Sequence, residues 1–176
     1  MDNNDRLIRL RYALDIKDTQ MIEIFKLGGV ILTEEEVRKL LIKSKDGYDI
    51  MMNNTTEENI PCDNRTLEAF LNGLIIFKRG KQDAKPGQPE NPPFIITDNK
   101  SVNNILLKKL KIALSLTSED MLDILQKAGV VISKGELSAV FRKEGHKNYK
   151  ACGDRYARNF LKGLAIKHRE LNKEEQ

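Results

Sequence analysis

The chain has 176 residues, of which 40% are hydrophobic and 32% charged, and its formal net charge is +4. This length suits one ordinary domain or two small ones, and the composition is typical of a soluble helical protein. The N-terminus lacks the apolar run of a signal peptide, and nowhere do about 18 apolar residues follow one another. We therefore expect neither export nor a membrane partner. Two cysteines then favour free thiols in a reducing cytoplasm.

The sequence contains two copies of one unit. Residues 3–43 align with residues 103–143 at an offset of 100, and 12 of the 41 pairs are identical. Residues 61–79 align with residues 151–169 at an offset of 90, with 8 identities in 19 pairs. We call residues related by these offsets twins. Most other apolar positions stay apolar between twins, so both copies are expected to fold alike.

The first two helices of each copy are predicted from apolar spacing. In the first copy, a helix begins at an asparagine cap and carries Leu7, Leu10 and Leu14 on one face. The next helix runs from about Asp18 to a stop at Gly29, where a left-handed residue closes it. The second copy repeats both patterns 100 positions later.

The third and fourth helices are marked by a capping box and a glycine motif. The third opens with Thr33 and Glu36 in the first copy and with Ser133 and Glu136 in the second. The fourth carries FLNGL or FLKGL. Its Phe and Leu side chains are expected to face the core, and its glycine would let another backbone approach closely.

Two stretches interrupt the repeat. Residues 44–60 form an insertion in the first copy, which we expect on the surface. Residues 80–100 contain four of the five prolines, so this stretch is predicted to be a connector without a helix. Phe94 to Thr97 within it are apolar enough to lie against one of the repeats.

These elements predict an all-α fold of two tandem homologous four-helix repeats, packed with pseudo-two-fold symmetry. The predicted division is residues 1–80 for the first repeat, 81–100 for a proline-rich linker, 101–170 for the second repeat and 171–176 for a charged tail. A unit of roughly 75 residues buries little core by itself, so we expect the two copies to pack through their apolar faces.

The doubled RYAL/KIAL, MIEIF/MLDIL and CxxRxxxxFLxGL elements resemble the YehS-like bacterial proteins, whose repeat is catalogued as domain of unknown function 1456. The resemblance covers both repeats, and the FLNGLIIFKRG and CGDRYARNFLKGL stretches are specific to it. It implies a cytosolic bacterial protein. It implies no reaction, cofactor or active-site residue.

The two cysteines, Cys62 and Cys152, are twins, and each lies just before an expected helix cap, Asp63 or Asn64 in one copy and Asp154 in the other. A site that occurs twice in a duplicated scaffold favours a packing role, with the thiol on the first turn of the helix. The alternative is a reactive thiol, since a helix start and a nearby arginine lower a thiol pKa. No twin histidine accompanies either cysteine, so a Cys–His nucleophile pair is not supported.

Other catalytic or metal-binding chemistry is not indicated. His146, Cys152 and His168 are too loosely spaced for a typical metal set. The chain lacks a phosphate-binding loop and a dinucleotide-binding glycine motif. The sequence therefore predicts no catalytic residue, no metal and no cofactor, and it favours a non-enzymatic protein while leaving enzymatic activity open.

Charge is the most informative signal. Residues 1–80 carry 12 Lys+Arg against 14 Asp+Glu, whereas residues 81–176 carry 18 against 12. A helical wheel places the bases of the last helix in a stripe opposite the core face, and a cluster at Lys108, Lys109 and Lys111 adds to them. Such a stripe can meet nucleic-acid phosphates. The candidate contacts are Lys108, Lys111, Arg142, Lys143, Arg155, Arg158 and Lys162.

The alternative function is a protein–protein interaction adaptor that binds no nucleic acid, with its grooves or its PPFIIT linker engaging a partner. In that case the bases serve only solubility. Glu68 replaces Arg158 in the first copy, and the chain has no Trp for base stacking, which favours this alternative. The sequence leaves the oligomeric state open.

Overall fold

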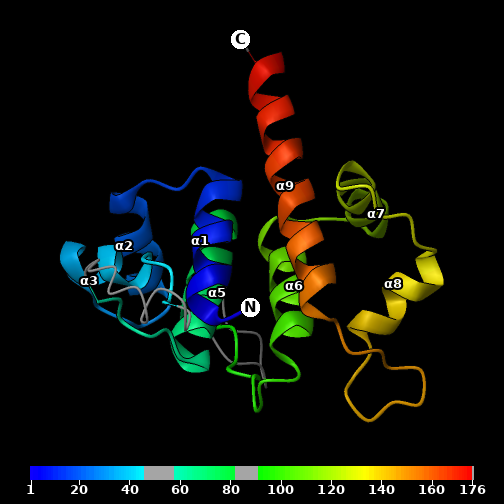
Figure 1. The fold of residues 1–176 in the computed structure, drawn as a ribbon, viewed down its shortest axis with the longest axis horizontal. Helices are drawn as coiled ribbons and strands as arrows, with labels where there is room; N and C mark the ends of the chain where they lie inside the picture. Colours follow the sequence, from blue (N-terminus) through cyan, green and yellow to red (C-terminus); the bar gives the residue numbers. More distant parts are fainter. Residues whose placement is uncertain (46–57, 82–90, 176) are drawn as a thin grey trace.

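The computed structural model describes residues 1–45, 58–81 and 91–175. This part of the chain holds eight α-helices and no β-strand, which confirms the all-α prediction (Figure 1). Most of the predicted insertion lies outside the described residues. The helices are α1 (Asn3–Leu14), α2 (Asp18–Leu27), α3 (Glu34–Leu40), α5 (Asn64–Arg79), α6 (Val102–Ala113), α7 (Ser118–Lys127), α8 (Lys134–Phe141) and α9 (Asp154–Glu174).

The first and last helices of each copy form the centre of the molecule. In Figure 1, α1 and α9 lie side by side in front of α5 and α6. α1 packs against α9, and α5 packs against α6, so each copy contacts the other through both of these helices. α2 and α3 flank this centre on one side, and α7 and α8 flank it on the other.

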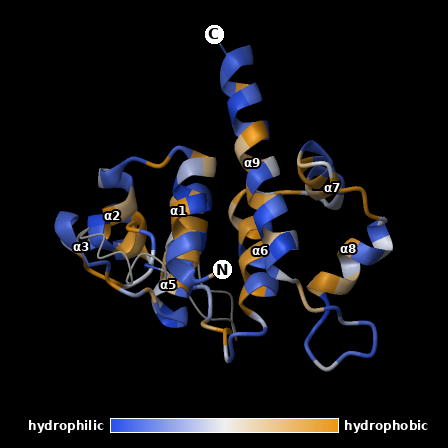
Figure 2. Ribbon diagram, in the orientation of Figure 1, coloured by the Kyte–Doolittle hydropathy of each residue, from blue (hydrophilic) through white to orange (hydrophobic). Residues whose placement is uncertain are grey.

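One apolar core runs through both copies. Leu7 and Leu10 of α1 and Leu107 and Leu110 of α6 are fully buried, as the helical spacing predicts. Figure 2 shows hydrophobic and hydrophilic residues interleaved along the helices, while the last turns of α9 are mostly hydrophilic. The helix α9 includes residues 171–174 of the stretch that the sequence assigns to a charged tail.

The helix starts differ in part from the sequence prediction. The cap of α1 is Asp2, whose side chain accepts a hydrogen bond from the Asp5 amide, while Asn3 lies inside the helix. The predicted asparagine cap is therefore wrong. Asp154 is not a cap either, because Gly153 precedes α9 and Asp154 is its first residue. Asp63 does cap α5, accepting from the Thr66 amide.

The buried asparagines instead tie the loops to the helices. The Asn4 side chain donates to the carbonyl oxygens of Leu40 (3.0 Å) and Ile60 (2.8 Å) and accepts from the Cys62 amide (2.9 Å). Its twin, Asn104, bonds the corresponding loop of the second copy in the same way. This bonding explains why asparagine occurs at both positions, since buried polar groups are stable only when they are hydrogen-bonded.

The predicted ends and close approaches of helices are present. Gly29 and Gly129 have φ values of 94° and 83°, the left-handed geometry that closes α2 and α7. A Cβ atom on Gly73 would lie 1.8 Å from the carbonyl oxygen of Ile24, and one on Gly163 would lie 1.8 Å from that of Ile124. Only glycine therefore lets α5 contact α2, and α9 contact α7, at these points.

The capping boxes are partly reciprocal. Thr33 accepts from the Glu36 amide, and the Glu36 carboxylate accepts from the Thr33 amide at 3.1 Å. Ser133 accepts from the Glu136 amide at 3.1 Å. Both helices thus begin where the sequence predicts, because these side chains satisfy amides that have no partner within the helix.

Candidate functional site

Four of the seven predicted contact residues gather at one edge of the second copy. They line two neighbouring cavities beside α6 and α8, which share the side chains of Lys108, Phe141 and Arg142. The four bases are Lys108, Lys111, Arg142 and Lys143. The structure therefore brings together residues that lie more than 30 positions apart in the sequence.

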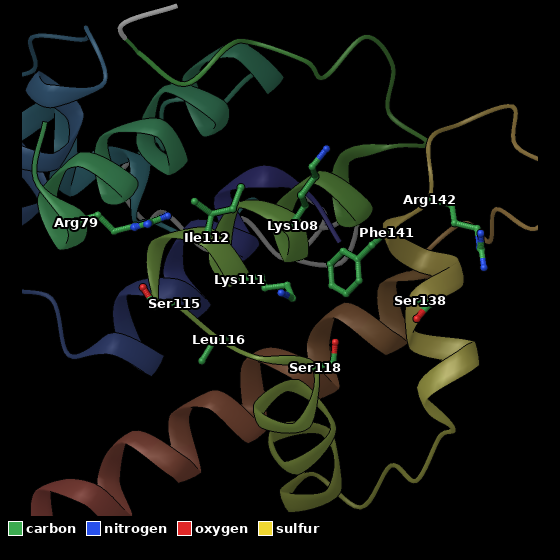
Figure 3. A pocket seen from close by; sticks show the side chains of 10 residues that line it. All are labelled: Arg79, Lys108, Lys111, Ile112, Ser115, Leu116, Ser118, Ser138, Phe141 and Arg142. Atoms are coloured by element: carbon green, nitrogen blue, oxygen red, sulfur yellow. The ribbon is translucent and has the colours of Figure 1, made fainter. Parts of the chain in front are cut away.

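The larger cavity is a cleft of about 710 Å³, which we call the α6–α8 cleft (Figure 3). Its walls come from α6, the start of α7, α8 and the end of α5, and Lys111 and Ser118 lie on opposite walls. None of the described lining residues is acidic. They are Arg79, Lys108, Lys111, Ile112, Ser115, Leu116, Ser118, Ser138, Phe141 and Arg142.

Three bases of this cleft, Lys108, Lys111 and Arg142, are available to a ligand. Lys108 and Arg142 are exposed, and Lys111 is half-buried. Within the described part of the chain, none of these three side chains forms a hydrogen bond or an ion pair. Three cationic groups around one cavity, with no carboxylate among its described lining residues, create a positive potential that attracts anions.

One of these bases has a basic twin in the first copy, and there an acid pairs with it. Arg11 is the twin of Lys111, and its guanidinium forms an ion pair with Asp18 at 2.5 Å. In the second copy, Ser118 takes the place of Asp18. The same helix position therefore carries a paired base in one copy and, as far as the described residues go, an unpaired base in the other.

A second acid is lost at the turn that follows the first helix of each copy. Asp15 and its twin Ser115 have nearly the same left-handed backbone, with φ values of 49° and 51°. The backbone is thus kept while the charge is removed. Two bases are also gained, because the twins of Lys108 and Arg142 are isoleucines.

The serines and Arg79 of the cleft were not among the predicted contacts. The signal for Ser115 and Ser118 was present in the internal alignment, where two acids of the first copy become hydroxyls in the second, whereas Ser138 has an arginine as its twin. Arg79 carried no such signal, because it belongs to the first copy and reaches the cleft through the packing of α5 on α6.

Lys109 is not part of the basic surface that the sequence suggests. It is 3% exposed, and its ammonium forms an ion pair with the Glu68 carboxylate of α5 at 2.8 Å. Burial lowers the pKa of Lys109, while Glu68 acts in the opposite direction. The residue links the two copies through a buried charge pair rather than facing solvent.

The remaining three predicted bases lie on α9 and line neither of these two cavities. Arg155 and Lys162 are exposed, and Arg158 is half-buried. Phe160 and Leu161 of the same helix are buried, as the helical wheel predicts. The seven predicted contacts thus form two separate groups.

The two thiols are structural. Cys62 and Cys152 are free and buried, and the amide of each is held by an asparagine side chain. Burial raises the pKa of both thiols to about 12, and a weaker effect of the Arg6 charge opposes this rise. The packing interpretation is therefore favoured over the reactive thiol, since a nucleophilic cysteine needs a lowered pKa.

Arg6 connects three helices at the contact between the copies. Its guanidinium donates to the side chains of Asn3 (2.8 Å) and Asn103 (2.9 Å) and forms an ion pair with Asp154 at 3.3 Å. The hydrogen bond from Asn103 contributes most to lowering the pKa of Asp154. These interactions hold the starts of α1, α6 and α9 together.

Two further findings concern metals and membranes. Among residues 1–45, 58–81 and 91–175, no group of three or more His, Cys, Asp or Glu side chains is arranged to hold a metal ion. His146 accepts a hydrogen bond from the Asn148 amide through Nδ1. In the described residues, no helix has the length and apolar character needed to cross a bilayer.

The fold and the cleft define a helical protein with two copies of one sequence unit. The family described as "Protein of unknown function (DUF1456)" matches in two segments, residues 3–80 and 103–170. The chain is also 37% identical over 168 residues to the uncharacterized protein YehS of Escherichia coli strain K12, covering 95% of this chain and 96% of that protein. The chain belongs to this family, which confirms the resemblance seen in its sequence. No solved structure matches it.

Proposed function

We propose that the protein binds the phosphate backbone of a nucleic acid through the α6–α8 cleft of its second copy. The observation that carries this proposal is the contrast between twins: Arg11 pairs with Asp18, whereas Lys111 and Ser118 line a cleft with no acid among its described residues. Cationic side chains contact phosphate directly, and serine hydroxyls donate hydrogen bonds to it.

The shape of the cleft also supports a polymeric anion. Lys143 lines the adjoining cavity of about 480 Å³, which shares Lys108 and Arg142 with the cleft. The bases therefore extend along an edge rather than surrounding one point. A phosphate backbone presents charges in such a row, and binding releases the counterions condensed on it.

The α9 bases Arg155, Arg158 and Lys162 remain a prediction as nucleic-acid contacts. They provide a matched comparison, because they are cationic residues of the same copy that do not line the cleft. Reversal of their charge changes the net charge as much as reversal of three cleft bases does. A difference between the two variants then reports on location rather than on total charge.

The test is a salt series with fluorescent single- and double-stranded oligonucleotides, measured by anisotropy. We expect the affinity to fall steeply as the salt concentration rises. The variant Lys108→Glu/Lys111→Glu/Arg142→Glu should bind more weakly, and its slope of log affinity against log salt concentration should be smaller by the equivalent of about three phosphate contacts. The variant Arg155→Glu/Arg158→Glu/Lys162→Glu should retain more of the binding. Equal loss in both variants, or no binding by the unaltered protein, removes the proposed site.

We also propose that the two copies are four-helix repeats related by pseudo-two-fold symmetry, in a bacterial cytoplasmic protein divided as the sequence suggests. The reciprocal packing of α1 on α9 and of α5 on α6 supports this symmetry. The matched bonding of Asn4 and Asn104 supports it as well. An experimental structure in which the two copies superpose poorly would contradict it.

The alternative, a protein-interaction adaptor, is favoured by one observation. A second groove of the molecule, between α1 and α9, is open and basic. The linker, which was the other candidate for partner binding, is already bound within the molecule through Glu68, Asn72 and Lys109.

A further inference from the structure

The linker shows what the groove between α5 and α6 accepts. The Asn72 amide donates to the carbonyl oxygen of Pro92 at 3.1 Å, and the Lys109 ammonium donates to that of Pro93 at 2.7 Å. The Glu68 carboxylate accepts hydrogen bonds from the next amides, those of residues 95 (2.8 Å) and 96 (2.9 Å). A non-helical segment is thus held on these two helices by its main chain.

The groove between α1 and α9 is the counterpart of this site in the duplicated sequence. α1 and α6 are twins, as are α5 and α9, and the two helix pairs contact each other in the same manner. A cavity of about 530 Å³ lies between α1 and α9, and all its lining residues come from these two helices. In the described part of the chain, no linker residue covers it.

The three linker-binding residues have cationic twins at the open groove: Arg9 and Lys162 line its cavity, and Arg158 lies one helical turn before Lys162 on α9. Arg158 replaces Glu68, Lys162 replaces Asn72, and Arg9 stands in the place of Lys109. Arg9 is paired with Asp5 at 3.0 Å. Within the described residues, Arg158 and Lys162 have no hydrogen bond or ion pair.

This exchange reverses what the groove requires of a ligand. Glu68 accepts hydrogen bonds from main-chain amides, whereas arginine and lysine side chains can only donate. An occupant of the open groove must therefore supply acceptors, and charged carboxylates form the strongest bonds with such donors. A second copy of the linker, with its free amides directed at Arg158, would not fit.

The floor of the open groove is apolar and includes an exposed aromatic ring. Ile8 and Ile166 line it, and Tyr12 is 63% exposed. The guanidinium of Arg169 lies over the Tyr12 ring, 4.0 Å from its centroid. An apolar side chain of a ligand would find a surface here, next to the cationic groups.

From these observations we infer that the groove between α1 and α9 binds a non-helical, acidic peptide segment of a partner protein. The carboxylates of the segment pair with Arg158 and Lys162, and a neighbouring apolar side chain packs on Ile8 and Tyr12. This site is separate from the α6–α8 cleft, and its occupation does not depend on nucleic-acid binding.

The test uses the full chain and three short, fluorescein-labelled synthetic peptides of equal length. All three contain one aromatic and two aliphatic residues. The remaining residues are Asp and Glu in the acidic peptide, Asn and Gln in the neutral peptide, and Lys and Arg in the basic peptide. We expect the acidic peptide to bind at least about tenfold more tightly than the neutral one, since each charge-assisted hydrogen bond adds to the affinity. The double variant Arg158→Glu/Lys162→Glu should abolish this preference.

Two controls locate the effect. Arg155→Glu, an exposed charge reversal about two helical turns before Lys162 and so farther from the cavity than Arg158, should leave peptide affinity within about twofold, because distant exposed charges are screened by solvent. The cleft variant Lys108→Glu/Lys111→Glu/Arg142→Glu should bind the acidic peptide normally. The experiment can therefore reject the peptide site without rejecting the nucleic-acid site, and the reverse.

Three outcomes would overturn the inference. The first is equal affinity for the three peptides, and the second is acidic-peptide binding that survives Arg158→Glu/Lys162→Glu. The third is binding of a single-stranded oligonucleotide to this groove, if that binding is lost in the same double variant and the acidic peptide does not compete with it. Circular dichroism of each variant should show unchanged helix content, because Lys162 is exposed and Arg158 is only half-buried.

Discussion

The twin cysteines lie in the same local arrangement, each directly before the start of a long helix. A helix start and a nearby cation lower a thiol pKa, but burial has the opposite effect and is the larger contribution here. We therefore expect both thiols to stay protonated at physiological pH. At the scale of single residues, the surroundings of Cys62 and Cys152 therefore matter more than their sequence motif.

This leads to a prediction for the thiols. In the native protein, both cysteines should react slowly with a thiol reagent at slightly alkaline pH, and both should react rapidly after unfolding in guanidinium chloride. The folded pKa of about 12 lies above the ordinary value of 9.0. Folding therefore favours the protonated thiols: their stabilising contribution is complete below pH 9 and is lost as pH rises toward 12.

The control is the double variant Cys62→Ala/Cys152→Ala. Its unfolding free energy should depend less on pH between 9 and 12 than that of the unaltered protein. One rapidly reacting thiol in the folded state would contradict the structural role and would restore the hypothesis of a reactive cysteine.

At the scale of elements, the helix pairs α2–α5 and α7–α9 depend on glycines at their closest approach: Gly28 and Gly73 in the first pair and Gly163 in the second. The variant Gly163→Ala places a methyl group 1.8 Å from the carbonyl oxygen of Ile124, so the two backbones must separate. We expect a loss of about 3 kcal/mol or more in the free energy of unfolding, as for severe overpacking. Urea unfolding monitored by circular dichroism measures it.

A matched glycine gives the opposite expectation. Gly135 lies in α8, and the nearest atom to a Cβ there is the Ser133 hydroxyl at 3.8 Å. The variant Gly135→Ala should stabilise the protein by about 0.5–1 kcal/mol, because alanine loses less backbone entropy in a helix. Similar stability of the two variants would show that the helices move apart without cost.

Periodicity, caps and glycine motifs predict the helices of this chain well, because they depend on contacts within a few residues. The pairing of α1 with α9 did not follow from them. The error at Lys109 has the same origin: α6 lies against α5, α8 and α9, so Asn103, Asn104 and Lys109 are buried along with its apolar residues. A helix covered on several sides cannot be recognised from a one-sided apolar stripe.

At the scale of the whole molecule, the buried pair of Lys109 and Glu68 joins the two copies. The variant Lys109→Met leaves the Glu68 carboxylate buried without its cation, so we expect a loss of about 3–5 kcal/mol. The double variant Glu68→Gln/Lys109→Met should recover most of the lost free energy of unfolding, because it leaves no buried charge and the Gln oxygen still accepts hydrogen bonds. Chemical denaturation of the four proteins in a double-mutant cycle measures the coupling.

An exposed pair supplies the comparison. The Lys134 ammonium lies 2.7 Å from the Glu119 carboxylate, and both side chains are largely exposed. Lys134→Met should change stability little, because solvent screens such pairs. Equal effects of Lys109→Met and Lys134→Met would show that water reaches the pair between the copies.

The position of the linker has a consequence for stoichiometry. Two unconnected copies would form a symmetric dimer with two equivalent grooves, each able to receive a ligand. Joining them in one chain requires a connector, and this connector fills the groove between α5 and α6 with its own main chain. If the groove between α1 and α9 binds a peptide as we propose, each chain should therefore bind one peptide, because in the described residues the equivalent surface on α5 and α6 is taken by the linker.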